Sequence, residues 1–165
     1  MYSLAVKNKT KEFVDKYGKG IALAIKGTGL FFSTIVAQKA LESGWGSSGL
    51  TKEANNFGGI KYNPNLVGVI GFVTKDTTEF VDGKKVFIKQ KFSKFKDIES
   101  GVKATIQVLM LDRYANARTN AKTPEEQVLM IAKAGFTTTP PNVYLSRVKG
   151  IIEATQDYTG LGRIS

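Results

Sequence analysis

Cysteine and histidine are both absent from this sequence of 165 residues. Without them the chain has no thiol nucleophile and no serine–histidine or cysteine–histidine pair. The same absence excludes a zinc site of the usual histidine and cysteine kind, and it leaves no disulfide to indicate a redox compartment. Any acid–base chemistry must therefore depend on carboxylates, tyrosine or lysine, and we expect neither a metal nor a cofactor.

Long apolar runs are missing as well. No run reaches the ~18 residues of a membrane span, and residues 1–7 lack the apolar core of a secretory signal. The length fits one domain over residues 1–165. The net charge of +10 indicates affinity for a polyanion such as nucleic acid, anionic lipid or a bacterial wall polymer. Its lysines and arginines are scattered along the chain, which disfavours a dedicated nucleic-acid-binding segment.

The most informative stretch is residues 31–46, whose pattern predicts an apolar helix that ends in a carboxylate. Apolar residues recur at helical spacing on more than one side, so we expect this helix to be buried among others. Gly44 and Gly46 end it, which places Glu42 at its C-terminal end beside Trp45, the only tryptophan. There the helix dipole and apolar neighbours would disfavour the ionised carboxylate, which suits a general acid. The alternative is an ordinary solvated glutamate at a helix end.

Further helices are indicated by apolar periodicity and capping residues. They are predicted over residues 8–26, 47–54, 97–113, 124–133 and 142–153. Residues 55–62 combine two asparagines, two glycines and two aromatics, which predicts a rigid polar loop. The loop is either a simple turn or a sugar-binding wall, in which amides bind hydroxyl and acetamido groups and rings stack on pyranose faces.

A β-hairpin is predicted over residues 72–92. Asp82-Gly83 between two β-favouring runs is the strongest short signal for such a hairpin. A two-residue turn pairs Glu79 with Val86, so that Glu79 lies among apolar cross-strand neighbours near the hairpin tip. Its alternative is a solvated edge residue beside the lysines that follow the turn. The fold class is therefore α+β and mainly α.

Residues 37–46, Ala-Gln-Lys-Ala-Leu-Glu-Ser-Gly-Trp-Gly, closely resemble the signature of the bacterial glucosaminidases of glycoside hydrolase family seventy-three, relatives of the lysozyme-like hydrolases. Later segments follow in the family's order. They are an asparagine pair with a Gly-Ile-Lys segment at 55–61, an acid at 77–79, an aromatic-rich segment at 92–95 and a loop at 136–144. The resemblance covers about residues 30–153. It implies a lysozyme-like helical domain with a small β-hairpin lobe flanking a cleft.

The resemblance implies a peptidoglycan hydrolase, an endo-β-N-acetylglucosaminidase that cleaves the β-1,4 bond after N-acetylglucosamine. It implies that Glu42 is the general acid and Glu79 the second carboxylate, acting as a base on water or stabilising charge. Tyr144 would line the cleft floor and orient the substrate's acetamido group. Phe136 stands where the family often has tyrosine, which affects subsite detail. The expected substrate-binding residues are Gln38, Trp45, Asn56, Phe57, Tyr62 and Phe136.

Other functions on the same residues stay open. A lytic transglycosylase would use one glutamate and leave Glu79 dispensable, and a muramidase would cut the other glycosidic bond. A non-catalytic wall-binding domain predicts that Glu42→Gln leaves function intact, whereas a nucleic-acid-binding domain predicts binding that falls steeply with salt.

The expected partner is the peptidoglycan glycan strand, with an immunity or inhibitor protein as a further candidate for the cleft. We expect a monomer that binds no nucleic acid and does not insert into a membrane. Action in the bacterial cell envelope without a signal segment implies delivery by a dedicated secretion machine, by a phage, or from a longer precursor that has been trimmed.

Overall fold

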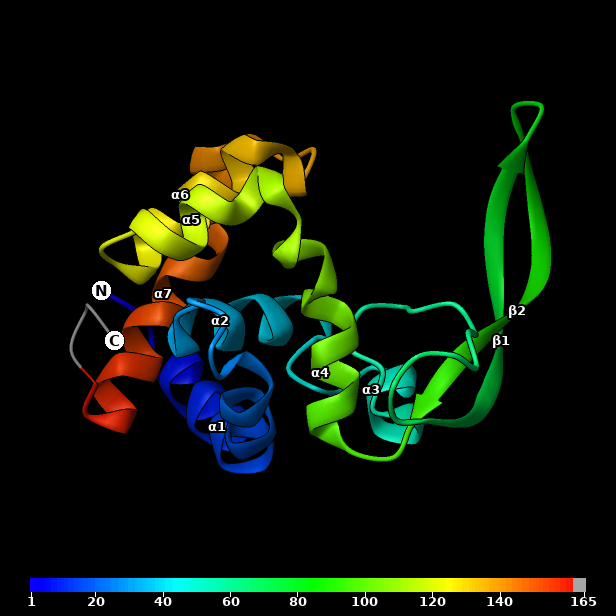
Figure 1. Ribbon diagram of the computed structural model, residues 1–165, viewed down its shortest axis with the longest axis horizontal. Coiled ribbons are helices and arrows are strands. Elements are labelled where there is room, and N and C mark those ends of the chain that lie inside the picture. Colours follow the sequence, from blue (N-terminus) through cyan, green and yellow to red (C-terminus); the bar gives the residue numbers. More distant parts are fainter. Residues whose placement is uncertain (162–165) are drawn as a thin grey trace.

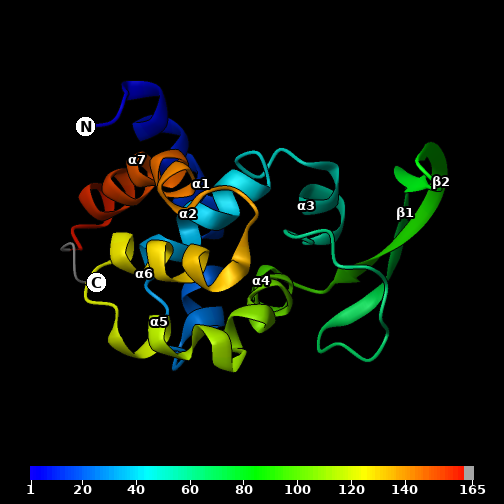
Figure 2. The ribbon, with the colours of Figure 1, turned by 90° about the horizontal axis from the view of Figure 1, so that it is seen from above.

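Helix α2, Phe32–Glu42, runs through the middle of a helical body in the computed structural model, which describes residues 1–161 (Figure 1). Helices α1, Leu4–Ile25, and α7, Pro141–Thr159, pack along it (Figure 2). Every residue of α2 from 33 to 40 is buried. The prediction of a buried helix that ends at Glu42 is therefore confirmed, because apolar residues on several of its sides meet different neighbours.

The remaining helices surround this centre. Helix α3 spans Gly49–Ala54, α4 spans Ile98–Ile106, α5 spans Ala115–Asn120, and α6 spans Pro124–Ile131. Helix α4 is shorter than predicted, since the chain tightens into the short turns η1, Gln107–Met110, and η2, Asp112–Tyr114, before α5. A wider turn, η3, covers Ala132–Phe136 before the loop that leads into α7. Helices α1 and α7 are both longer than predicted.

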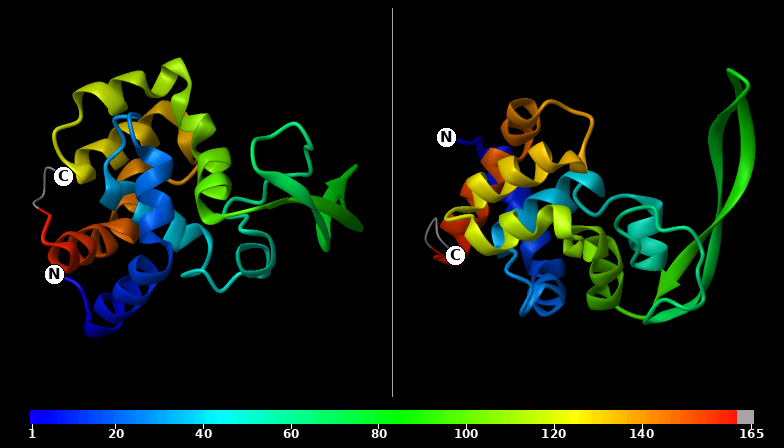
Figure 3. Two further views of the ribbon diagram at one scale, coloured as in Figure 1. Left: turned by 60° about the horizontal axis from the view of Figure 1, so that its bottom comes forward. Right: turned by 45° about the horizontal axis from the view of Figure 1, so that its top comes forward.

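The predicted hairpin is present and longer than expected. Strands β1, Val69–Val81, and β2, Lys84–Phe95, pair antiparallel, and Glu79 lies opposite Val86 as the turn length predicts. Asp82 and Gly83 both have positive φ, which matches the turn that suits the twist of a two-residue hairpin. The hairpin stands away from the helical body on the side of α3 and α4 in each view (Figure 3).

The loop at residues 55–62 connects the helical body to the base of the hairpin. The Tyr62 N–H donates to the Lys91 carbonyl at 3.0 Å, and the Ser93 N–H donates to the Ile60 carbonyl at 3.0 Å. These bonds pair residues 60–62 with the outer edge of β2 through a single β-bridge between Lys61 and Phe92. The position of the loop is therefore fixed relative to the base of the hairpin. None of the helices described in residues 1–161 combines the length and the apolarity that crossing a bilayer would need.

Candidate active site

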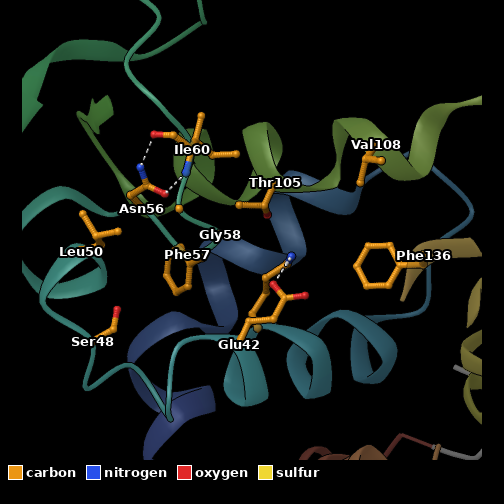
Figure 4. A pocket seen from close by; sticks show the side chains of 12 residues that line it. Glu42, Ser48, Leu50, Asn56, Phe57, Gly58, Ile60, Thr105, Val108 and Phe136 are labelled. Carbon is orange, nitrogen blue, oxygen red and sulfur yellow. Dashed lines mark hydrogen bonds and ion pairs between the residues drawn. The ribbon is translucent and has the colours of Figure 1, made fainter. Parts of the chain in front are cut away.

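A cleft of about 540 Å³ lies between the C-terminal end of α2, the loop at residues 56–60, and the α4–η1 segment, with Phe136 opposite (Figure 4). Glu42 points into the middle of this space, with Phe57 and Thr105 around it (Figure 4). Among the described residues that line the cleft, Lys39 and Glu42 are the only two that carry a charge. Its chemistry therefore centres on this pair.

The end of α2 places Glu42 in the cleft. Gly44, Trp45 and Gly46 all adopt positive φ, so the chain turns sharply directly after the helix. The Trp45 N–H closes the helix on the Ala40 carbonyl at 2.7 Å. The Glu42 side chain is left 29% exposed at the end of a helix whose residues 33–40 are all buried. This is the position in which a carboxyl group can meet both solvent and a bound ligand.

Lys39 lines the cleft beside Glu42, although the sequence did not single it out. Its Nζ lies 3.1 Å from Glu42 Oε2, and its side chain is only 2% exposed. The sequence led us to expect only apolar neighbours at Glu42, whereas the structure places an ammonium group in contact with its carboxyl group. The available signal was a lysine inside a helix predicted to be buried, three residues before the glutamate and so on the same face.

Tyr144 and Gln38 lie behind Glu42. Burial raises the pKa of the Tyr144 hydroxyl, and the charge of Glu42 raises it further, while the nearby Gln38 side chain opposes the shift. The hydroxyl therefore stays protonated at neutral pH. Gln38 is fully buried, and the contact between its amide and Tyr144 is too loose to meet hydrogen-bond geometry. Both residues thus lie close to the acid, beneath the surface of the cleft.

The loop wall is rigid because its asparagine bonds to backbone. Asn56 is buried, and its Nδ2 donates to the carbonyls of Ile60 and Ser93, each at 3.0 Å. Its Oδ1 accepts from the Ile60 N–H at 3.0 Å. Asn56 lines the cleft as predicted, but its amide holds the loop to the hairpin. The polar atoms of this side chain are thus bonded to backbone, which leaves contacts with any ligand on this wall to the backbone and to neighbouring side chains.

Two predicted aromatic residues border the same cleft. Phe57 is nearly buried, with its ring edge-on to Tyr17 at a centroid distance of 5.2 Å. Phe136 faces Glu42 across the cleft, with Tyr114 and Tyr144 each at a centroid distance of 6.3 Å (Figure 4). Phe136 is only partly buried, so its ring is the one better placed to meet a ligand in the cleft.

Five predicted site residues are absent from the cleft lining: the buried Gln38 and Tyr144, and also Trp45, Tyr62 and Glu79. Trp45 lines a separate pocket with Tyr17. Tyr62 is 38% exposed and packs on Phe72, at a centroid distance of 5.1 Å. Glu79 lies near the hairpin tip, 48% exposed, with Lys61 Nζ 3.9 Å from its Oε1.

Residues 19–157 match the family model described as glucosaminidase, mannosyl-glycoprotein endo-beta-N-acetylglucosaminidase. The chain belongs to this glucosaminidase family. The peptidoglycan hydrolase FlgJ of Salmonella typhimurium is 30% identical over 136 residues, which cover 79% of this chain and 42% of FlgJ. The exo-glucosaminidase LytG of Bacillus subtilis is 29% identical over 126 residues, which cover 73% of this chain and 43% of LytG. This glucosaminidase-family chain thus spans less than half the length of either relative.

A solved structure is similar to this glucosaminidase-family chain over most of its length. The catalytic domain of the autolysin Auto from Listeria monocytogenes aligns with a TM-score of 0.75 at 26% identity, over 93% of this chain and 88% of that domain. The fold is the lysozyme-like glycoside hydrolase fold that the sequence predicted. In this fold Glu42 ends the buried central helix, at the mouth of the cleft.

Proposed function

We propose that this glucosaminidase-family chain hydrolyses the β-1,4 bond after N-acetylglucosamine within peptidoglycan glycan strands, with Glu42 as the general acid. The observation that carries the proposal is the Glu42 carboxyl group, held at the end of a buried helix and directed into a 540 Å³ cleft. Membership of the glucosaminidase family supports it, as do relatives named peptidoglycan hydrolase and exo-glucosaminidase.

In the proposed reaction the glycan lies between the loop at residues 56–60 and Phe136. Glu42 gives its proton to the glycosidic oxygen as the bond from that oxygen to C1 breaks, and the leaving sugar departs as an alcohol. Water then adds to C1 and loses a proton to a base, which completes the hydrolysis. The Tyr144 hydroxyl, kept neutral by burial and by Glu42, is available to donate a hydrogen bond to the substrate's acetamido oxygen.

Glu79 is the proposed second carboxylate, and it needs the hairpin to approach the cleft. Glu79 forms an ion pair with Lys61, and Lys61 directly follows Ile60, a residue that lines the cleft. This ion pair therefore links the hairpin to the cleft wall. A hairpin that bends over bound substrate would bring Glu79 toward the water. The position of Glu79 outside the cleft lining favours a second candidate, a lytic transglycosylase that needs only Glu42 and forms an anhydro sugar.

The test is a digestion of purified peptidoglycan, followed by borohydride reduction and mass spectrometry of the new chain ends. We expect reduced N-acetylglucosamine from the wild type and a loss of at least about a hundredfold in rate for Glu42→Gln. Glu79→Gln should also reduce the rate if it is the base. Anhydro-N-acetylmuramic acid with full activity of Glu79→Gln would establish the transglycosylase, and reduced N-acetylmuramic acid would establish a muramidase.

Glu53→Gln is the matched control, because Glu53 is an exposed glutamate that pairs with Lys75 at 2.7 Å outside the cleft. It should digest at the wild-type rate.

Long fragments early in the digestion would support endo action, whereas steady release of terminal sugars would support exo action. The proposed substrate places the activity in the bacterial cell envelope. An immunity protein that fills the cleft would abolish digestion in the same assay.

A further inference from the structure

Two phenylalanine rings stand in water near the tip of the hairpin. Phe80 is 77% exposed and Phe87 is 76% exposed. Phe87 lies opposite Thr78, two residues before Phe80 on β1, so the two rings are diagonal neighbours on one face of the sheet. Neither ring lines the cleft that holds Glu42. Neighbouring large apolar side chains left in water mark a binding surface.

The two rings belong to a face of the hairpin that is exposed along its length. Side chains alternate between the two faces of a strand, and the pairing of β1 with β2 assigns each residue to one face. The outer face, as we call it, consists of Phe72, Thr74, Asp76, Thr78, Phe80, Lys85, Phe87, Lys89 and Lys91. Every one of these side chains is exposed.

The opposite face of the hairpin turns toward the helical body. There Lys75 Nζ lies 2.7 Å from Glu53 Oε2 of α3, and Lys61 Nζ lies 3.9 Å from Glu79 Oε1. Helix α3 and the loop before Lys61 both contribute residues to the cleft lining. The outer face therefore points away from the cleft, on the hairpin that projects from the body (Figure 3). A ligand on this face is separate from a glycan segment held at Glu42.

The outer face carries two clusters of rings and lysines. At the base of the hairpin, Lys91 Nζ lies 4.4 Å from the centroid of the Phe72 ring, and the Tyr62 ring packs on Phe72 at 5.1 Å. Near the tip, Lys85 Nζ lies 5.8 Å from the centroid of the Phe87 ring. Two threonine hydroxyls and one exposed ion pair lie between the clusters. Rings, hydroxyls and ammonium groups thus follow one another along the hairpin.

We propose that the outer face binds a second glycan strand of peptidoglycan, a neighbour of the strand that is cleaved in the cleft. The inference rests on the proposed function for the identity of the polymer. The exposed rings stack on sugar faces, the threonine hydroxyls bond to sugar hydroxyls, and the lysines pair with carboxylates of the lactyl groups and stem peptides. A single linear polymer therefore matches every kind of group on this face.

Two other occupants match the outer face less well. A second copy of the chain would bring like charges together, because the face carries three lysines against one aspartate. A lipid bilayer surface would accept the rings and the lysines. It would also take the Asp76 carboxylate and the threonine hydroxyls between the two clusters out of water, at a cost in free energy.

A second strand on the outer face would hold the enzyme to the wall between cleavage events. Two sites on one rigid chain make the second binding event intramolecular, which strengthens attachment to a polymer that offers both strands. Short soluble glycans occupy the cleft alone and gain nothing from the outer face. The effect of the outer face is thus confined to insoluble peptidoglycan.

The test replaces both exposed rings in one variant, Phe80→Ser with Phe87→Ser. The matched control is Leu4→Ser with Leu23→Ser, which removes two exposed apolar side chains from α1. Phe80→Tyr with Phe87→Tyr keeps both rings, and urea unfolding confirms that each variant is folded. Binding to isolated peptidoglycan, stripped of anionic polymers, is measured by pull-down in a Glu42→Gln background. The salt is about 300 mM, so that general attraction of charge is screened.

We expect the serine pair to bind about tenfold more weakly, because two stacking rings have been removed. The tyrosine pair and the α1 control should bind like the parent protein. In the active enzyme, the serine pair should slow the digestion of insoluble peptidoglycan. It should leave unchanged the rate of cleavage of a short soluble peptidoglycan tetrasaccharide.

Unchanged binding of the serine pair would overturn the inference. An equal loss of rate on the soluble tetrasaccharide would also overturn it, since the rings would then act through the cleft or the fold. Loss of binding to phosphatidylglycerol vesicles, with wall binding intact, would assign the outer face to a membrane instead. A wild type that digests no peptidoglycan would contradict the proposed function, whereas the pull-down with Glu42→Gln would still decide whether the rings bind the wall.

Discussion

Asn56 and Glu42 both line the cleft, yet their polar atoms are used differently. The Asn56 amide is committed to three bonds with backbone groups, whereas the Glu42 carboxyl group has one bond and an open side toward the cleft. At the scale of the residue, the sequence could indicate which polar side chains gather here. It could not indicate which of them bind backbone, because one of the partners of Asn56, the Ser93 carbonyl, lies on β2, 37 residues away in the sequence.

Replacing Asn56 tests this structural role. Asn56→Ala removes three hydrogen bonds and leaves buried backbone groups unsatisfied, so we expect the free energy of unfolding to fall by about 2–4 kcal/mol. Urea denaturation measures the change. Asn65→Ala is the control, since Asn65 is an exposed asparagine in the following loop, and its effect should stay within about 0.5 kcal/mol. Equal effects of the two changes would contradict the role assigned to Asn56.

The break after α2 decides where Glu42 points, and it depends on Gly46. Gly46 has φ of +79°, and a Cβ built on it would lie 2.5 Å from the Tyr17 ring. Both the backbone conformation and the close approach of α1 therefore require glycine at this position. The sequence predicts that the helix ends here, but the approach of Tyr17 is a tertiary feature that no local pattern contains.

Gly46→Ala should destabilise the fold by more than the backbone conformation alone explains. Gly27 is a matched comparison, because its φ is +77° and no atom lies within 4 Å of the added Cβ. We expect Gly27→Ala to cost about 1 kcal/mol of unfolding free energy. Gly46→Ala should cost about 3 kcal/mol or more, since crowding against Tyr17 adds to that strain. Thermal and urea unfolding measure both, and similar losses would show that the contact with Tyr17 relaxes freely.

At the scale of the element, local signals predicted well where they were strong. Asp82-Gly83 predicted the register of the hairpin, and Asp97 caps α4 as expected, accepting from the Ser100 N–H at 2.8 Å. The sequence did not predict α5 or the break at Gln107, since the apolar pattern there suits one continuous helix as well as a bent segment. Nor could it place Glu79 relative to the cleft, because the direction of the hairpin is set by packing at its base.

At the scale of the whole molecule, half of the net positive charge lies in one segment, which the fold places on and beside the projecting hairpin. Residues 61–96 contain eight lysines against Asp76, Glu79 and Asp82, which makes +5 of the net +10. Most of these lysines lie on the hairpin that projects from the helical body (Figure 1). A projecting basic element next to the cleft would attract an anionic polymer toward the site before the glycan is bound.

Binding to intact wall should therefore depend on salt and on the hairpin. In a Glu42→Gln background, which prevents digestion, we expect binding to isolated peptidoglycan carrying anionic polymers to weaken severalfold between about 50 and about 300 mM salt, because salt screens exposed charges strongly over this range. Replacing Lys84, Lys85 and Lys89 by glutamine should lower binding at low salt severalfold. Those three side chains are exposed at or near the hairpin tip.

The control replaces three exposed lysines of equal total charge outside the hairpin, Lys7, Lys19 and Lys26, on α1 and directly after it. Both triple variants have the same net charge, so a general effect of charge would weaken binding equally in a pull-down assay with isolated wall. A local effect of the hairpin would weaken binding only in the first variant and reduce its dependence on salt. Equal losses of wall binding in the two variants would mean that the hairpin lysines contribute no more to wall binding than other exposed lysines. The hairpin would then contribute to the proposed reaction through Glu79 alone.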